Sequence, residues 1–460
     1  MKTGRTAGVL AAALALLALL VGLRVLRQNL RSGPPASATR SAFPPPTASA
    51  GPAHPSFLYG LVTTVDGAAY QGRLRWGGGE EAFWGDYFNG AKKANPWVVH
   101  IPPGQLPMER QPFRIFGLQV ASRERPVDLN RLFMARFGDI ARIEASGRDV
   151  RITLKSGTAF ELDRFSASDF DDGVRVWDAA HGVVDLDSLR IRAIDLRPSP
   201  GAGQEARQEN GPAPNQLHGT VRTRQGEEFS GFVEWDRQQC LGSDELAGHT
   251  AAGDRSIPFS AIRSIARHSS DSTRVILLDG GDLVLSGTRA VGQENRGVYV
   301  DDPRYGRVLV SWDSFERLEF SPGAGGPAYG DFPPGGPLTG TVTTRDGRHL
   351  VGRLVYDLDE SEFTETLDAP SRGVDYTIPF AMIASVVLPG PDEPAAQHAT
   401  VTLHSGRELH LERAGDLGKA NAGILIFASG QQRPEYVPWT AVAQVTFNRP
   451  PASYPPLDAH

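Results

Sequence analysis

The sequence predicts an all-β protein in which one N-terminal transmembrane helix is followed by three tandem repeats. Three observations lead to this prediction. Apolar residues alternate with a period of two over short runs, glycines interrupt these runs at fixed spacing, and the whole pattern returns three times along the 460 residues. Each repeat is in turn a pair of related halves, and we expect each half to form a small β-barrel of about five strands.

The first block of each repeat has one spacing of apolar residues and glycines. The aligned positions are Leu58, Gly60, Val62, Thr64, Gly67, Tyr70 and Gly72; Leu217, Gly219, Val221, Thr223, Gly226, Phe229 and Gly231; and Leu338, Gly340, Val342, Thr344, Gly347, Leu350 and Gly352. An aromatic residue follows four positions later in each copy, at Trp76, Trp235 and Tyr356. Alignment without a gap over so many positions indicates that the three copies share one structure.

A second block in each repeat has the spacing of the first block. Its positions are Ile152, Leu154, Gly157, Phe160 and Leu162; Val275, Leu277, Gly280, Leu283 and Leu285; and Val401, Leu403, Gly406, Leu409 and Leu411. In both blocks a dipeptide that ends in glycine, such as Asp66-Gly67, separates two alternating runs. This pattern predicts a β-hairpin, because tight hairpin turns need a positive φ that glycine adopts at little cost.

Each half closes with apolar residues at a period of three. The first halves end in Phe137, Ile140 and Ile143, in Phe259, Ile262 and Ile265, and in Phe380, Ile383 and Val386. The second halves end in Ile191, Ile194 and Leu196, in Trp312, Phe315, Leu318 and Phe320, and in Trp439, Val442, Val445 and Phe447. A period of three next to a period of two predicts a strand, a short 3₁₀ turn and a last strand.

Segments rich in Pro and Gly mark the expected boundaries. We expect a transmembrane helix at 1–31, a Pro/Ala/Ser-rich linker at 32–56, repeat 1 at 57–197 with an insertion at 77–135, a linker at 198–216, repeat 2 at 217–320, a Pro/Gly linker at 321–337, repeat 3 at 338–448 and a tail at 449–460. Linkers of this composition favour three separate modules, each a pair of barrels. A six-bladed β-propeller with one half per blade is the alternative architecture.

Repeat 3 carries a run that resembles a known family. The residues are Asp346, Gly347, Arg348, Leu350, Gly352, Leu354, Tyr356 and Asp357. This run resembles the first signature of the Sm-like small β-barrels, and the resemblance covers mainly residues 338–386. It implies a small barrel of the Sm-like or SH3-like kind. Members of that family bind RNA through an Asn and an Arg/Lys-Gly pair. Ser361 and Ala384-Ser385 stand at those places, so RNA binding does not carry over.

The N-terminal segment is typical of a signal anchor. Residues 7–23 form a run of 17 apolar or glycine residues, along which lie Leu10, Leu14, Leu17 and Leu20. As a helix the run is about 25 Å long, which suffices to cross a bilayer when flanking arginines reach toward the headgroups. Arg-Val-Leu-Arg occupies the place where a cleavage site would lie. We therefore expect an uncleaved anchor in the bacterial inner membrane, single-pass, with the bulk of the chain in the periplasm; a cleaved signal peptide and a buried core helix are the alternatives.

Charge and motif content disfavour several classes of function. The formal net charge is −6, and the first 31 residues hold five basic residues and no acidic one, which leaves −11 on the rest. This charge disfavours nucleic acid as a partner. The single Cys240 excludes an internal disulfide and a cysteine-based zinc site. We find no motif for a catalytic, cofactor or metal site, and Asp169, Asp171 and Asp172 before Gly173 fit a recurring turn better than a calcium loop.

Repeat 1 carries an insertion that is rich in aromatic and basic residues. The interval from Gly67 to Gly157 is 90 residues, and the corresponding intervals in repeats 2 and 3 are 54 and 59. Because aromatic residues are enriched in interfaces, we expect this segment to contact a partner. The candidate contact residues are Phe83, Trp84, Tyr87, Phe88, Trp97, Phe113 and Phe116. Extra core that covers an open barrel end, and contact with lipid headgroups, are the alternatives.

These expectations favour a non-catalytic, membrane-anchored extracytoplasmic scaffold or accessory subunit. Its partners would be protein subunits of a larger membrane or envelope complex, which the repeated modules would hold through several weak contacts. The second hypothesis is an array of carbohydrate- or cell-wall-binding modules, in which Trp84 and Trp97 stack on sugars. An enzyme is the least favoured class, because it would need polar residues that converge in one pocket of repeat 1.

Overall fold

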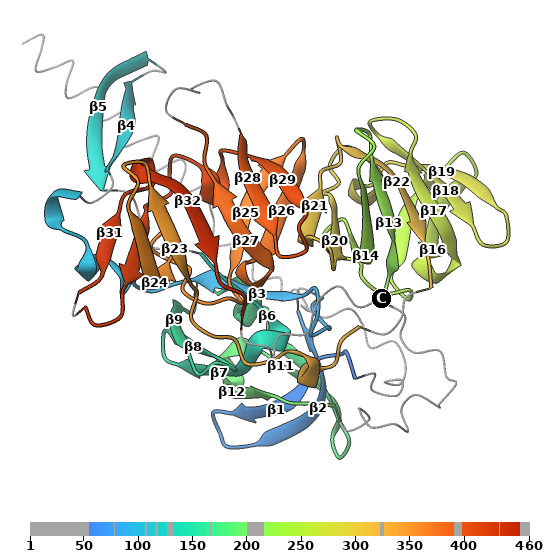
Figure 1. The fold of residues 1–460 in the computed structure, drawn as a ribbon. Helices are drawn as coiled ribbons and strands as arrows, with labels where there is room; N and C mark the ends of the chain where they lie inside the picture. Colours follow the sequence, from blue (N-terminus) through green and yellow to red (C-terminus); the bar gives the residue numbers. More distant parts are fainter. Residues whose placement is uncertain are drawn as a thin grey trace, which may run out of the picture. The chain divides into compact units, whose positions relative to one another are not determined.

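The structure is a computed structural model that describes residues 55–77, 79–105, 108–115, 118–126, 132–165, 167–199, 216–322, 326–390, 398–431 and 433–450 (Figure 1). The predicted transmembrane helix at 1–31 lies outside these ranges. Within them, no helix has the length and apolar character needed to span a membrane. The prediction of an all-β chain is confirmed: the regular structure consists of strands, short 3₁₀ turns and the four-residue helix α2 (Ser168–Asp171).

The strands follow the predicted hairpins in all three repeats. Repeat 1 contains β1 (Tyr59–Thr64), β2 (Ala69–Trp76), β3 (Tyr87–Ala91), β4 (Met108–Ile115), β5 (Leu118–Pro126), β6 (Leu132–Arg136), β7 (Ile140–Ser146), β8 (Asp149–Leu154), β9 (Ala159–Asp163), β10 (Val174–Asp178), β11 (Gly182–Leu186) and β12 (Ile191–Leu196). Repeat 2 contains β13 (His218–Thr223), β14 (Glu228–Trp235), β15 (Glu245–Thr250), β16 (Gly253–Pro258), β17 (Ile262–Arg267), β18 (Ser272–Leu277), β19 (Asp282–Ser286), β20 (Val298–Asp302), β21 (Gly306–Val310) and β22 (Phe315–Phe320). Repeat 3 contains β23 (Thr339–Thr344), β24 (His349–Val355), β25 (Thr366–Ser371), β26 (Val374–Pro379), β27 (Ile383–Val387), β28 (His398–Leu403), β29 (Glu408–Glu412), β30 (Ile424–Phe427), β31 (Glu435–Val437) and β32 (Val442–Phe447).

Turns and closings also match their sequence signals. The hairpin glycines have left-handed φ values between 86° and 93°: Gly67, Gly157, Gly226, Gly280, Gly347 and Gly406. Three-residue 3₁₀ turns lead into closing strands: η3 (Phe137–Asp139), η4 (Ser188–Arg190), η6 (Phe259–Ala261), η9 (Phe380–Met382) and η11 (Trp439–Ala441). The predicted hairpin turns and 3₁₀ closings are therefore confirmed at these positions.

In each repeat, strands of the first half form backbone hydrogen bonds with strands of the second half. In repeat 1 the first strand of the first half, β1, pairs with β12, the closing strand of the second half, and β2 pairs with β10. The strand that closes the first half, β7, pairs with β8, the first strand of the second half. The same pairings recur as β13–β22, β14–β20 and β17–β18 in repeat 2, and as β23–β32, β24–β30 and β27–β28 in repeat 3. Each half thus satisfies backbone groups of the other.

The exchanged pairings join the strands into large sheets. The two closing strands of a repeat pair with each other, as β7–β12, β17–β22 and β27–β32. Sheets of eight, twelve and eight strands result, besides the two-stranded pairs β3–β6 and β4–β5. A six-bladed propeller would instead divide the strands into six separate four-stranded sheets.

The twelve-stranded sheet continues from repeat 2 into repeat 3 (Figure 1). Its joint is the antiparallel pair β21–β26, in which Val308 lies opposite Tyr376. The rings of Phe229, Tyr305 and Tyr376 gather at this joint, with centroids 5.6–6.2 Å apart. One hydrophobic core accordingly extends through repeats 2 and 3.

The segment between repeats 2 and 3, predicted as a linker, packs on repeat 1. Tyr329 and Phe332 are 8% and 5% exposed and belong to the core of repeat 1. The Tyr329 hydroxyl donates to the carbonyl of Ile140 (2.9 Å), and the Lys155 ammonium donates to the carbonyls of both aromatic residues (2.5 and 2.9 Å). Residues 326–332, which lead from repeat 2 into repeat 3, are therefore held on repeat 1 by packing and hydrogen bonds.

We expect Phe332→Ala to lower the free energy of unfolding by about 3–5 kcal/mol, because it removes a buried ring from the core of repeat 1. Denaturant unfolding followed by tryptophan fluorescence measures this loss. The matched control is Phe165→Ala, whose ring is 72% exposed, and its cost should stay near or below about 0.5 kcal/mol. Equal effects of the two variants would contradict the packing of Phe332 on repeat 1.

Candidate functional site

Some of the predicted contact residues lie in the core of the chain itself. Phe83 and Phe88 are fully buried in the core of repeat 1, and Tyr87 is nearly so. These three positions match the alternative of extra core. The backbone of Phe113 lies in β4, whereas Phe116 lies outside the described residues.

Trp84 and Trp97 are partly buried and contact other segments. The Trp84 ring lies 6.1 Å from that of Phe332, and the Trp97 ring lies 5.9 Å from that of Phe427 in repeat 3. Trp97 packs there on a small apolar cluster, which consists of Ile101, Val355, Leu358, Ala422 and Leu425. The insertion therefore contacts repeat 3, and its contact with an outside partner stays a prediction.

A buried lysine of the insertion forms ion pairs with two carboxylates of repeat 3. Lys92, which follows β3, is 8% exposed, and its ammonium lies 2.8 Å from Asp359 and 3.0 Å from Glu365. Three residues further on, Asn95 donates to the carbonyl of Leu358 (2.8 Å). Because all three charged groups are out of water, each depends on the others for its stabilisation.

Asp359 and Glu365 belong to a loop that recurs in the three repeats. We define loop 1 as residues 76–86, loop 2 as 235–244 and loop 3 as 356–365. In each loop the amide of the leading aromatic residue donates to the carbonyl four positions on: Trp76 to Glu80 (3.0 Å), Trp235 to Gln239 (2.7 Å) and Tyr356 to Glu360 (2.8 Å). A carboxylate at the end of each loop accepts two amide hydrogens: Asp86 from Glu81 and Ala82, Asp244 from Cys240 and Leu241, and Glu365 from Ser361 and Glu362. Positions 80, 239 and 360 are thus equivalent, as are positions 86, 244 and 365.

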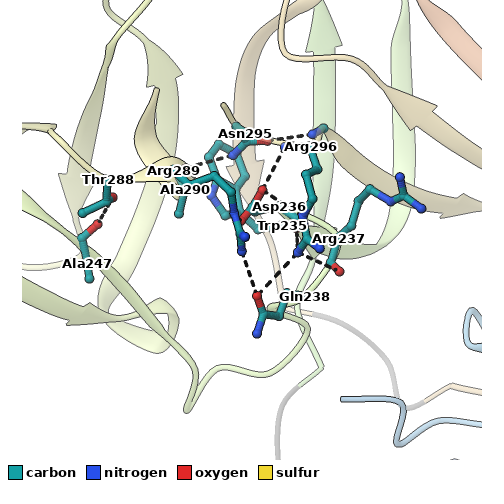
Figure 2. A network of polar contacts seen from close by, with 11 residues as sticks. Trp235, Asp236, Arg237, Gln238, Ala247, Thr288, Arg289, Ala290, Asn295 and Arg296 are labelled. Carbon is teal, nitrogen blue, oxygen red and sulfur yellow. Dashed lines mark hydrogen bonds and ion pairs between the residues drawn. The ribbon is translucent and has the colours of Figure 1, made fainter. Parts of the chain in front are cut away.

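Loop 2 binds two arginines of its own repeat, as Figure 2 shows. The fully buried Asp236 accepts hydrogen bonds from Nε of Arg289 (2.8 Å) and from the backbone amide of Arg296 (2.8 Å). Gln238 also accepts from the Arg289 guanidinium (3.1 Å). Asp236 and Arg237 have left-handed φ values of 52° and 53°, which form the tight turn after β14. This turn aims the carboxylate of Asp236 at the arginines.

Loop 1 keeps one carboxylate oxygen without a partner. Glu81 forms ion pairs with Arg73 and with Arg75, the latter at 2.6 Å. The Oε2 atom of Glu80, by contrast, is buried and has no hydrogen-bond partner among the described residues. The equivalent residues of the other two loops, Gln239 and Glu360, also have a buried side-chain oxygen without a hydrogen-bond partner among the described residues, and Glu360 and Lys92 both line a small cavity.

Glu80 faces a cavity of about 370 Å³ to which all three repeats contribute. Its charged and aromatic lining residues are Glu80, Asp86, Asp169, Glu234, Arg237, Arg307, Tyr87 and Tyr299. Arg307 is already engaged, because it pairs with Glu234, donates to the carbonyl of Gly85 and lies 3.9 Å from the Tyr299 ring centroid. The carboxylates of the lining outnumber its guanidinium groups by four to two.

Burial raises the pKa of several carboxyl groups in and beside this cavity. Burial, with smaller contributions from the carboxylates of Asp169 and Asp86, raises the pKa of Glu80 to about 8. Burial and then Glu234 raise the pKa of Asp86 to about 7. Burial also raises the pKa of Asp301, which lies beside Arg307, to about 6. Near neutral pH the cavity therefore retains protons that carboxyl groups in water have released.

Potential metal ligands and the thiol of Cys240 also lie around this cavity. In the described part of the chain, no three or more His, Cys, Asp or Glu side chains are grouped to hold a metal ion. The predicted recurring turn is confirmed, because Gly173, Gly297 and Gly423 have left-handed φ values of 77°, 101° and 96°. Burial raises the pKa of the Cys240 thiol well above its ordinary value, so that this thiol stays protonated near neutral pH.

The sequence does not single out Glu80 and Asp86, and it shows Lys92 only as one of the basic residues of the insertion. A signal for Glu80 was present, because an acid or amide follows four positions after the leading aromatic residue in every repeat. Lys92 gave no such signal, since its partner Asp359 is 267 positions away. Comparisons with models of known protein families, with curated proteins and with solved structures gave no match to this chain.

Replacing Lys92 with methionine should lower the free energy of unfolding by about 3–5 kcal/mol, because Asp359 and Glu365 would stay buried without a counter-charge. Lys93→Met is the matched control. Lys93 pairs with Asp149 at 2.7 Å, but its side chain is 52% exposed, so we expect a much smaller loss. Chemical denaturation measures both values, and an equal loss in the two variants would contradict the importance of the buried pair.

Stability should fall as the pH rises through the range set by Glu80. Its pKa is raised from 4.5 to about 8, so between these values the folded protein holds a proton that the unfolded chain has released. The Tm should therefore decrease from pH 5 to pH 9, with a cost from Glu80 of roughly 4–5 kcal/mol at the upper end. Glu80→Gln should flatten the profile in part, since Asp86 and Asp301 act in the same direction. A variant profile identical to the wild-type profile would disprove this assignment.

Proposed function

We propose that the chain is a non-catalytic, membrane-anchored extracytoplasmic scaffold or accessory subunit that binds and stabilises a larger membrane or envelope protein complex. The observation that carries this proposal is the interlocking of the three repeats. The buried Lys92 pair, the β21–β26 joint and the packing of Tyr329 on repeat 1 hold the repeats to one another. A scaffold benefits from such contacts, because surfaces that are fixed in advance lose less conformational freedom when a partner binds.

Each repeat is, in this proposal, a pair of small barrels with exchanged strands. One barrel would contain β1, β2, β10, β11 and β12, and the other would contain β8, β9, β3, β6 and β7. The pairings β2–β10 and β7–β8 support this arrangement. Contacts between the third strand of one half and the second strand of the other add support, as in the pair His249–Ser286 of β15 and β19.

The proposed anchor is the apolar run at 7–23, which would place the protein in the bacterial inner membrane with the repeats in the periplasm. The length of the run supports the anchor. Because basic residues flank both ends of the run, the proposed orientation rests instead on the position of the run ahead of a long β region. A single helix would keep the repeats near other membrane proteins and raise their effective concentration there.

Exposed apolar side chains on the insertion are the best surface for such a partner. Val99 in η1 (Val98–His100) and Leu132 on β6 are each 81% exposed. They are better candidates than the buried Phe83 and Phe88, because a partner can reach them without unfolding the core. The glycan-binding hypothesis needs free aromatic faces, and the Trp97 ring already contacts Phe427.

The test is to extract native membranes in mild detergent and identify by mass spectrometry the proteins that stay with this chain through size exclusion. We expect a defined complex, and the double variant Val99→Asp with Leu132→Asp should lower partner recovery at least about tenfold. Val351→Asp is the control, because this residue is 61% exposed but lies on β24 of repeat 3. Elution of the wild-type chain as a lone monomer would overturn the proposal.

A further inference from the structure

Strand β11 is an edge of the eight-stranded sheet of repeat 1, and no described strand pairs with its outer side. Its counterpart in repeat 2 is β21, which forms the same hairpin with the preceding strand and also pairs with β26 of repeat 3. Gly182 begins β11 as Gly306 begins β21, and both glycines have left-handed φ values, 73° and 85°. The two strands are therefore equivalent edges, and among the described strands only β21 has a partner there.

The outer side of β11 is open where that of β21 is covered. A Cβ atom built on Gly306 would lie 2.7 Å from the carbonyl oxygen of Thr377 in β26, whereas one built on Gly182 would meet no described atom within 4 Å. Every residue of β21 is buried except the partly buried Leu309, while most of β11 is exposed, including Val183 at 46%. An open edge of this kind offers unpaired amide and carbonyl groups to another strand.

Two of the three rings that meet at the joint between repeats 2 and 3 have counterparts beside β11. At the joint, the rings of Phe229 and Tyr305 lie 5.6 Å apart at an interplanar angle of 70°, and both contact Tyr376. In repeat 1 the equivalent rings of Tyr70 and His181 lie 5.3 Å apart at 78°. The place of the third ring belongs to the strand that pairs with the edge, so repeat 1 has the near half of the same joint.

The joint is nearly symmetric, so one edge can form it with a second copy of itself. Val308 and Tyr376 lie opposite each other in the β21–β26 pair. Each of them lies four positions before the aromatic residue that opens its closing segment, Trp312 or Phe380. The paired strands therefore hold the same position in their two halves. Two copies of such a strand, paired in this register, are related by a two-fold axis through that position.

We infer that the chain forms a two-fold symmetric dimer, in which β11 pairs antiparallel with β11 of a second copy. In the register of the β21–β26 joint, Val184 lies opposite Val184 of the partner subunit, and Val183 lies opposite Asp185 of the partner subunit. No like charges oppose each other in this register, and Asp185 is already paired with Arg175 (2.7 Å). The dimer would continue the sheet of repeat 1 across the axis. This inference does not depend on the proposed scaffold function.

Edges β16 and β31 are less suited to the same pairing. The position that Val184 holds in β11 is taken by Arg255 in β16 and by Glu435 in β31, so self-pairing of either strand would oppose two like charges. Pairing of β11 with β16 would place Asp185 opposite Asp254, which is also unfavourable. Of these three edges, β11 is therefore the one that fits its own copy.

Disulfide cross-linking of the full chain in detergent tests the register directly. We expect Val184→Cys to form covalent dimers on oxidation, because its two copies would face each other across the axis. Val183→Cys is the matched control. Its side chain is the more exposed one, but its two copies would lie on a diagonal about 7–8 Å long, which is too far for a disulfide. Val351→Cys, 61% exposed on β24, and the wild-type chain with its Cys240 measure cross-linking by random collision.

Analytical ultracentrifugation of the purified chain as a function of its concentration measures the dimer affinity. Val183→Pro should raise the dissociation constant at least about tenfold, because it removes an amide hydrogen that faces the partner strand on both sides of the axis. Its Tm should stay near that of the wild type, since proline is tolerated at a solvent-facing edge. Val183→Thr should change the dissociation constant by less than about twofold, because it keeps the amide and a β-branched side chain.

Three results would each overturn the inference. The first is a wild-type chain that stays monomeric at every concentration. The second is cross-linking at position 183 that equals cross-linking at position 184, which would exclude the register. The third is a dimer that persists unchanged in Val183→Pro, since another surface would then hold the two copies together.

Discussion

Backbone hydrogen bonding between the two halves of a repeat is the constraint on which the rest of the structure depends. The hairpin β1–β2 has outer edges that are satisfied by β12 and β10, both from the other half. This exchange brings the start of β20 against the end of β14, with Val298 opposite Trp235. Loop 2 leaves β14 at that point, so the arginines that precede β20 lie within reach of Asp236. The strand exchange therefore decides which segments meet the recurring loops.

In each of the three loops a buried carboxylate pairs with a positive side chain, and the segment that supplies this side chain differs from repeat to repeat. Each loop buries carboxylates near its backbone turn, and a buried carboxylate needs a proton or a positive partner. Loop 2 receives arginines from its own repeat, while loop 3 receives Lys92 from the insertion of repeat 1. The insertion is thus more than added length, because it carries the counter-charge for a loop in a different repeat. In loop 1 the buried Glu81 pairs with Arg73 and Arg75, while Glu80 faces a cavity of about 370 Å³.

The features that the sequence predicted correctly are local ones. Hairpin turns at residues such as Gly67 follow from the need for positive φ, and the 3₁₀ closings follow from a period of three. The apolar spacing does not predict that strands pair between the two halves. Both halves carry the same spacing, so pairing within a half and pairing between the halves would bury the same residues. The sequence predicts a linker at Tyr329 and Phe332, since Pro and Gly dominate around them. Aromatic content alone also failed to separate core from surface in the insertion, where Phe83 proved to be buried.

The packing of Tyr329 and Phe332 on repeat 1 affects when the core of repeat 1 can be completed during synthesis. A ribosome produces the chain from its N-terminus, so repeat 1 is complete at residue 197 while the two rings that finish its core still lie more than 130 residues ahead. At about 5–20 residues per second, the first repeat waits roughly 7–27 s with that part of its core uncovered. During this interval the surface around Gly138 and Lys155 is exposed to chaperones and to non-native contacts. Residues 326–332, between the second and third repeats, cover it once they have been synthesised.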